Sequence, residues 1–352
     1  MHVAIIADGG WIDSEPTALR ALEVGLLDEQ VRVTQVLPEH VKRAMGSGFS
    51  PKLTWRDSRV RWWRQRRLLQ LAGPLREAGA DLVHAMTVRM WVPAAKLACE
   101  LGVPVVFNCP SMHVVGRAGE AMRAASAMRA GFTATTQPIA EALRAAVGPG
   151  PLIERVPPGV HVPDETVARR AQPEAPCLVI TGTGRFDPQY AALFEALRVY
   201  VGKRPQAQFF LEAHGGDQHT LWQAAQRMGL LTHISIVPLQ ASAASVLLQA
   251  DAVLQPQASG RTHSFTLNAM AEGVPVLALA DPALDYLLDG QTAWVIDQPQ
   301  PHRWTARLDE MEAATGDIDR LIASARAWCS RHHLVSHRVV QVLKVYHALQ
   351  KG

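Results

Sequence analysis

The stretch QASGRTHSFTLNAMAEGVPV, which runs from Gln257 to Val276, combines the patterns of a loop, a helix and a strand. A polar loop leads into a helical pattern that ends before Gly273, and an apolar run follows. A Gly just past the end of a helix, followed by a short apolar segment, is typical of a helix that returns the chain to a buried strand. The stretch therefore predicts one helix–strand unit of an α/β protein.

The same alternation of apolar runs and helical stretches continues on both sides of this segment. In the first half the apolar runs are HVAIIA, VRVTQVL, DLVHAM, PVVFNC, GFTATT and IERVPP, and in the second half they include CLVITGTG, QFFLEAHGG, HISIVPL, DAVLQPQ, VPVLALA and TAWVID. One of the predicted helices is long and basic, RVRWWRQRRLLQLAGPLREAG. Short strands that alternate with helices predict a parallel sheet with crossover helices in each half.

The stretch PDETVARRAQPEAP, residues 163–176, interrupts this alternation with three prolines and no clear core positions. We interpret it as a linker. We therefore predict two Rossmann-like domains, residues 1–162 and 177–330, and a C-terminal helical segment, residues 331–352, that packs back on the first domain.

The composition is that of a globular chain. Of the 352 residues 48% are hydrophobic, and no apolar run approaches the roughly 20 residues of a membrane span. We interpret the start, MHVAIIADGG, as a first strand rather than a signal peptide. The cysteines form no C-x-x-C pair, so we expect a reduced, cytoplasmic setting without structural zinc.

The run Arg331-His332-His333, with His337 nearby, is the one place where histidines cluster. His333 and His337 are four residues apart and could share a helix face, but no Glu lies between them and no third ligand is obvious. We predict a solvated helix end here and no metal site.

Several motifs, in their order and spacing, resemble the family 4 retaining glycosyltransferases of the GT-B fold. They are DLVHAM, LIERVPPGVHVP, TGTGR, ADAVLQPQ, LNAMAEGVPVLA and DYLLDGQTAWV. The resemblance covers nearly the whole chain. It implies an α/β protein of the GT-B class, with two Rossmann-like domains that face each other across a cleft. It also implies an enzyme of the hexosyltransferase type, which moves a sugar from a nucleotide diphosphate sugar to an acceptor with retention. We expect no metal or other cofactor if Arg185 and a helix start neutralise the phosphates.

The departures from this family pattern lie in the donor site. The family's Glu-x7-Glu acids fall on Gly260 and Asn268, and its Gly-Gly pair falls on Asp281-Pro282. Because Gly260 cannot hold a sugar hydroxyl, a second hypothesis remains: a catalytically inactive GT-B-fold protein with a binding or regulatory role. A sugar-nucleotide epimerase on the same fold is a third.

Two devices for holding a diphosphate are nevertheless present. Gly182 and Gly184 follow a strand and let bare backbone approach a ligand, and Arg185 could grip a phosphate with two parallel bonds. The alternative is a tight turn with a solvated arginine. Thr262 or Ser264 could cap the next helix, whose first N–H groups would then point at the phosphates.

Four further residues are assigned to this donor site. Asn268 lies one turn after Ser264, and the resemblance places it at the ribose, where an amide holds less firmly than a carboxylate. Asp285 matches the family pattern and could contact the ribose or the sugar; it could equally be an acid at the start of a helix. Arg261 or His263 could substitute for the missing acid, with His263 as a candidate catalytic base.

Candidate residues in the first domain follow its strands. Gly9 and Gly10 come directly after strand one, where acceptor and phosphate loops lie in this fold, although a simple strand-to-helix turn explains them as well. His84 ends a strand and is the second candidate catalytic residue. His113, near the end of the next strand, could orient an acceptor hydroxyl. Each histidine taken alone could be structural.

The charge is unevenly placed. Residues 1–162 hold 19 Lys plus Arg against 14 Asp plus Glu, and between residues 41 and 78 ten bases face two acids. Residues 55–68 combine arginines at helical spacing with Trp62 and Trp63, a pattern of helices that contact anionic membrane surfaces. Inward packing of the tryptophans is the alternative, and no RNA-binding motif supports a nucleic-acid partner. We expect a cytoplasmic protein, peripheral on the inner membrane face.

Overall fold

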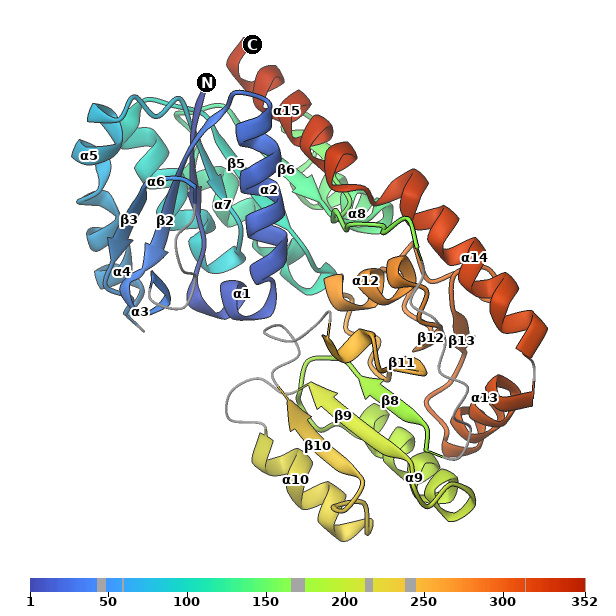
Figure 1. The fold of residues 1–352 in the computed structure, drawn as a ribbon. Coiled ribbons are helices and arrows are strands. Elements are labelled where there is room, and N and C mark those ends of the chain that lie inside the picture. The colour runs from blue at the N-terminus through green and yellow to red at the C-terminus, as the bar shows by residue number, and fades with distance from the viewer. Residues whose placement is uncertain are drawn as a thin grey trace. The chain divides into compact units, whose positions relative to one another are not determined.

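The computed structural model describes residues 1–42, 49–58, 60–165, 175–212, 218–237, 245–313 and 315–351. The chain divides into two compact units (Figure 1). Unit 1 is Met1–Gly159 with Val335–Gly352, and unit 2 is Val160–Leu334. Of the predicted linker, residues 166–174 lie outside the described part of the chain.

The described part of unit 1 contains a parallel sheet of seven strands in the order β3-β2-β1-β4-β5-β6-β7. The strands are β1 (His2–Ile6), β2 (Arg32–Pro38), β3 (Lys52–Trp55), β4 (Leu82–Ala85), β5 (Val105–Cys109), β6 (Ala130–Ala134) and β7 (Leu152–Arg155). The central strands are buried on both faces, and for this reason they read as continuous apolar runs in the sequence.

Helices cover both faces of this sheet. On one face α2 (Pro16–Asp28) and α15 (Val335–Lys351) pack against side chains such as Val3 and Ile5. On the other face, which Ala4 and Ile6 share, lie α4 (Arg61–Leu69), α5 (Ala72–Glu77), α6 (Val88–Leu101), α7 (Ala118–Ala124) and α8 (Gln137–Val147). The C-terminal helix α15 contacts α2, β6 and β7 and thus belongs to unit 1 (Figure 1). Three short helices complete the unit, α1 (Gly9–Ser14), α3 (Glu39–Lys42) and η1 (Met112–Arg117).

The described part of unit 2 contains a parallel sheet of six strands in the order β10-β9-β8-β11-β12-β13. The strands are β8 (Cys177–Ile180), β9 (Gln208–Glu212), β10 (Ile234–Val237), β11 (Ala252–Gln255), β12 (Val276–Leu279) and β13 (Trp294–Ile296). One face packs against α9 (Pro188–Lys203), α10 (Gln218–Arg227) and α13 (Pro301–Ala313). The other face packs against α12 (Ser264–Glu272), and α14 (Thr315–His332) contributes to both cores.

The stretch Gln257 to Val276 forms the loop after β11, helix α12 and the start of β12. Gly273 ends α12 with a φ of 86°, in the left-handed region that glycine enters without a steric penalty. The predicted helix–strand unit and the fold of two Rossmann-like α/β domains are confirmed.

Between residues 41 and 79 one local prediction was wrong and one strand was not predicted. The single helix predicted over residues 59–79 consists of two helices, α4 and α5, since Pro74 lacks the N–H that a continuous helix needs there but fits the first turn of α5. The edge strand β3, Lys52–Trp55, was not predicted, because its sequence KLTW is short and only partly buried.

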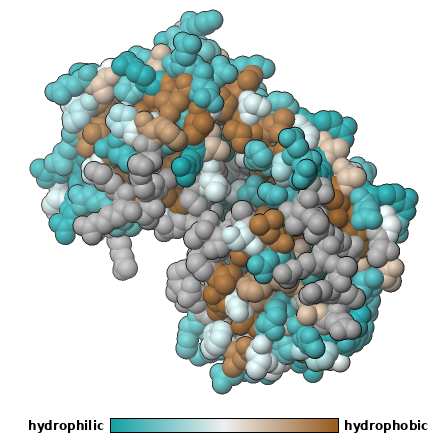
Figure 2. Space-filling model, in the orientation of Figure 1, coloured by the Kyte–Doolittle hydropathy of each residue, from teal (hydrophilic) through white to brown (hydrophobic). Residues whose placement is uncertain are grey.

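No helix in the part of the chain that the structure describes is long and apolar enough to cross a membrane. On the face of the molecule shown in Figure 2, hydrophilic side chains alternate with apolar ones.

Candidate functional site

The two loops that carry the predicted donor residues leave adjacent strands of unit 2. In the sheet β8 lies between β9 and β11, so the chain turns to one side after β8 and later continues on the other side. In open α/β sheets ligands bind at such a reversal, outside the carboxyl ends of the strands. Residues 181–187 follow β8 and residues 256–263 follow β11. The topology therefore brings the TGTGR loop and the start of α12 to the same edge.

The loop after β8 is shaped by its glycines. Gly184 has a φ of 74°, in the left-handed region. A Cβ at Gly182 would lie 2.8 Å from Gln257 Oε1 and 2.9 Å from Tyr190 Oη, closer than real Cβ contacts. The first of these glycines is thus required by packing and the second by backbone conformation.

Gln257 holds this loop from the loop that follows the neighbouring strand β11. Its Oε1 accepts bonds from the Thr183 N–H and hydroxyl, both at 2.8 Å. Its Nε2 donates to the Arg185 carbonyl at 3.2 Å and to the Asp187 carboxylate. The side chain is 3% exposed. The sequence analysis did not identify Gln257, because its four bonds reach residues about 70 positions away.

The Arg185 side chain extends from this loop into solvent. It is exposed and makes no hydrogen bond or ion pair with any residue that the structure describes. Its backbone is fixed on both sides, since its N–H donates to Thr183 Oγ1 at 3.3 Å and its carbonyl accepts from Gln257. A guanidinium on an ordered backbone is suited to binding an anion.

Helix α12 begins differently from the prediction. Its N-cap is His263, with φ −110° and ψ 116°, and this residue makes no side-chain cap bond. The prediction of Thr262 or Ser264 as N-cap was therefore wrong: Ser264 is the first helical residue, and Thr262 is a buried residue before the cap. The His263 ring is buried, with Nε2 3.3 Å from Ser259 Oγ, and the backbone N–H of His263 donates to Tyr286 Oη at 3.4 Å.

Asp281 fixes the loop in front of α12. Its Oδ2 accepts the Gly260 N–H at 2.7 Å, and its Oδ1 accepts the Ala283 N–H at 3.0 Å. Gly260 has a φ of 59°, a conformation that favours glycine. Asp281 stands where the family pattern has a glycine, and it supplies a buried carboxylate directly beside Gly260. This role was not predicted from the sequence.

The remaining donor candidates lie at the same end of unit 2. Asn268 is half-buried in the second turn of α12, and its side chain makes no hydrogen bond within the described part of the chain. Asp285 is half-buried in the segment after β12, and Arg261 is half-buried in the loop before α12. The structure therefore brings Gly182, Gly184 and Arg185 onto the loop beside the one that leads into α12.

In unit 1 the two glycines after β1 are the first residues of helix α1. Asp8 caps α1 by accepting the Trp11 N–H at 2.9 Å, and its other oxygen accepts the Thr87 hydroxyl at 2.8 Å. A Cβ at Gly9 would lie 2.5 Å from His40 Nε2, so Gly9 is explained by packing, while Gly10 has room for a side chain.

The two histidines of unit 1 differ in exposure. His84 is 1% exposed, and its Nδ1 lies 2.7 Å from Tyr346 Oη on α15. Burial, and then the nearby Arg338 charge, lower the pKa of His84 to about 3, so the ring is neutral at physiological pH. This geometry favours a packing role over the catalytic one that we predicted. His113 is exposed on η1, and its N–H donates to Ser111 Oγ at 3.3 Å.

The histidines near residue 333 do not form a uniformly solvated helix end. His333 is 1% exposed, with its ring against Tyr286, so that prediction was wrong for this residue. His332 stacks on Trp328 with ring centroids 4.3 Å apart. Within the described residues, no group of three or more His, Cys, Asp or Glu side chains is placed to hold a metal ion.

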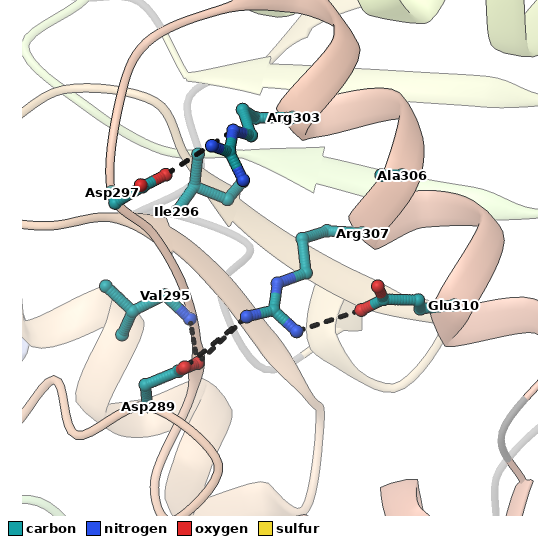
Figure 3. Close-up of a pocket in the computed structure, with 8 residues that line it drawn as sticks. All are labelled: Asp289, Val295, Ile296, Asp297, Arg303, Ala306, Arg307 and Glu310. Carbon is teal, nitrogen blue, oxygen red and sulfur yellow. Dashed lines mark hydrogen bonds and ion pairs between the residues drawn. The ribbon is translucent and has the colours of Figure 1, made fainter.

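A separate pocket of about 370 Å³ lies between β13 and α13 of unit 2 (Figure 3). Its charged side chains pair with one another: Arg307 binds Glu310 at 2.8 Å and Asp289 at 3.3 Å, and Arg303 lies 3.8 Å from Asp297. These cations are already paired, unlike Arg185.

No family model and no curated protein matches the chain. Solved structures do. HepE from Anabaena in complex with UDP-glucose is 17% identical, with a TM-score of 0.78 over 99% of this chain and 100% of that one. Sucrose-phosphate synthase from Thermosynechococcus elongatus is 15% identical, with a TM-score of 0.77 over 99% of both chains. A glycosyltransferase from Rickettsia africae is 10% identical, with a TM-score of 0.75 over 100% and 99%. The GT-B fold expected from the motifs is thereby confirmed.

Proposed function

We propose that this protein is a glycosyltransferase that binds a nucleotide diphosphate sugar in unit 2 and transfers the sugar to an acceptor with retention. The observation that carries the proposal is the pairing of two adjacent loops at the reversal of the sheet. One presents the exposed Arg185 on an ordered glycine loop, and the other leads into α12. The similarity to HepE, whose structure holds UDP-glucose, supports a nucleotide sugar as ligand.

The chemistry requires stabilisation of a leaving diphosphate. When the bond from the anomeric carbon to the phosphate oxygen breaks, its electrons remain on the phosphate while the sugar carbon becomes cation-like. A fixed guanidinium and the N–H groups at a helix start both stabilise that negative charge. Arg185 and the first turn of α12 are the groups we assign to this task, and with them the transfer needs no metal.

The nucleoside would lie farther along α12. Asn268 is assigned to the ribose, and Asp285 to the ribose or the sugar. Arg261 and His263 flank the position of the missing acid at Gly260, and His263 is the candidate base. On the acceptor side, Gly9, Gly10 and the exposed His113 remain the candidates in unit 1.

A second candidate function is a binding or regulatory protein without transfer activity. Gly260 favours this second function, because the resemblance expects a carboxylate at position 260 and glycine has no side chain. Calorimetric titration with UDP, GDP and ADP, followed by a turnover assay with the sugar nucleotides of the base that binds, separates the two. Binding with turnover supports the transferase, and binding without turnover supports the second function. No binding of any of the three nucleotides would contradict the donor site itself.

We also propose that unit 1 contacts an anionic membrane surface through α4, which fits a protein on the cytoplasmic face. Trp62 is 58% exposed and Trp63 is 45% exposed, and the Arg66 guanidinium lies 5.7 Å from the Trp62 ring. Exposed tryptophans beside arginines match the headgroup region of a bilayer, where aromatic rings and lipid phosphates are both available. Arg64, by contrast, is buried and paired with Asp57 at 3.3 Å.

A further inference from the structure

We propose that Gln257 is a positioning residue for the donor site, which sets the backbone of the Arg185 loop so that its guanidinium can meet a nucleoside diphosphate. The inference rests on the proposed function in one respect, because it takes a nucleoside diphosphate as the ligand. The assignment of Gln257 does not follow from the family motifs but from the hydrogen bonds of this chain.

The hydrogen bonds that reach this loop from outside converge on one side chain, and Phe186 at its end packs against Phe194. Within the described residues, every hydrogen bond from outside to residues 182–186 comes from the Gln257 side chain. The loop's own internal bond, from the Arg185 N–H to Thr183 Oγ1, depends on the same threonine that Gln257 holds. Gly182 also packs directly against Gln257 Oε1. Loss of this side chain would therefore release residues 183–185, while Phe186 stays packed against Phe194.

A carboxamide is required because the position both accepts and donates. The oxygen accepts two bonds from Thr183, and the nitrogen donates to the Arg185 carbonyl and the Asp187 carboxylate. An ionised carboxylate of the same shape can accept but cannot donate. It would face the half-buried Asp187 carboxylate, and two like charges at hydrogen-bond distance raise the pKa of the pair.

This arrangement allows a donor–acceptor swap. Asp187 caps α9 through Oδ1, which accepts the Gln189 and Tyr190 N–H groups, both at 3.0 Å. Asn caps helices about as well as Asp, so Asp187→Asn keeps this cap while it turns the other arm from acceptor into donor. The double variant Gln257→Glu, Asp187→Asn reverses the bond between the two side chains and leaves the net charge unchanged.

The experiment measures the affinity of these variants for UDP, GDP and ADP by calorimetry between pH 5 and 8. We expect Gln257→Glu to weaken binding by about tenfold or more at pH 8, and to recover as the pH falls and the carboxylate pair takes up a proton. The double variant should bind more tightly at pH 8 than Gln257→Glu alone. Gln189→Glu is the matched control: it adds the same charge, but its oxygen only accepts the Ala258 N–H at 3.2 Å, so affinity should stay near wild type.

Failure of this inference can be told apart from failure of the proposed function. If wild type binds a nucleotide but the Gln257→Glu loss is independent of pH, or the double variant shows no recovery, the positioning role is overturned. If wild type binds none of the three, the proposed function fails, and hydrogen exchange of residues 181–187 then tests the loop by itself. Exchange should be faster in Gln257→Glu at pH 8 and slower again in the double variant; unchanged exchange overturns the inference.

Discussion

Both units have polar side chains where their sheets reverse direction, but they use them in opposite ways. In unit 1 Asp8, after β1, accepts bonds from Trp11 and Thr87, and it is 4% exposed. In unit 2 the Gln257 side chain makes its hydrogen bonds to backbone and side-chain groups of residues 183–187, and the Arg185 guanidinium remains exposed. At the same point of the topology, unit 1 therefore has a polar group whose bonds are made inside the protein, and unit 2 has a charged group that is exposed. We therefore expect substitutions at the buried polar groups of unit 1 to change stability, and substitution of the exposed Arg185 in unit 2 to change binding.

The largest expected effect concerns a buried polar group of unit 1, His84. Its pKa in the folded protein is lowered to about 3, below the ordinary 6.5, chiefly by burial. Below pH 6.5 the unfolded chain takes up a proton that the folded chain does not. Stability is therefore full above that pH and falls as the pH drops toward 3, by up to about 1.4 kcal/mol per unit.

Urea unfolding at pH 7, 6, 5 and 4 gives the free energy of unfolding of wild type and of His84→Gln. The difference between the two measures the contribution of His84 to the pH dependence. Wild type should lose stability more steeply than the variant below pH 6.5. Parallel slopes for wild type and His84→Gln would show that His84 is not buried as a neutral ring.

In unit 2, substitution of the exposed Arg185 should change ligand affinity rather than stability. We expect Arg185→Ala to weaken nucleoside diphosphate binding by about 1.5–3 kcal/mol, the range for loss of a charge-assisted hydrogen bond, with little change in unfolding free energy. Calorimetry measures the affinity. Arg198, exposed on α9, is the matched control, and Arg198→Ala should bind as wild type does. Equal affinities for Arg185→Ala and wild type would remove Arg185 from the site.

The comparison of the two units also shows which features can be predicted from the sequence and which cannot. Strands, Gly273 as a helix stop and the glycine loop around Arg185 follow from local patterns that the sequence displays. Gln257 and Asp281 do not, because each acts through bonds to another loop, and a polar residue in a loop is not distinctive by itself. His84 lies 262 positions from Tyr346, its hydrogen-bond partner, so its burial depends on tertiary structure alone.

A smaller effect is expected at the surface of unit 1, on helix α4. We expect Arg66→Ala to weaken binding to anionic vesicles by about 1 kcal/mol in low salt, since each cation near such a surface contributes about that much. Vesicle flotation measures the bound fraction, which high salt should reduce for every variant. Arg76, exposed on α5 in the same unit, provides the control. An equal loss in Arg76→Ala would indicate general charge attraction, and negligible recovery of wild type in low salt would contradict membrane contact.

The smallest effect concerns the ribose position on α12. Asn268 is half-buried one turn after Ser264 and accepts hydrogen bonds without a charge. Asn268→Glu should strengthen nucleotide binding by about 1 kcal/mol if residue 268 faces the ribose hydroxyls, because a carboxylate is the stronger acceptor. If it faces the phosphates instead, like charges repel and affinity falls. Gln226→Glu is the control for charge, since Gln226 is exposed on α10, which packs on the other face of the sheet. Titration with the nucleoside as well as the diphosphate decides between these outcomes: a gain shared by both ligands places residue 268 at the ribose, whereas a loss confined to the diphosphate contradicts that placement.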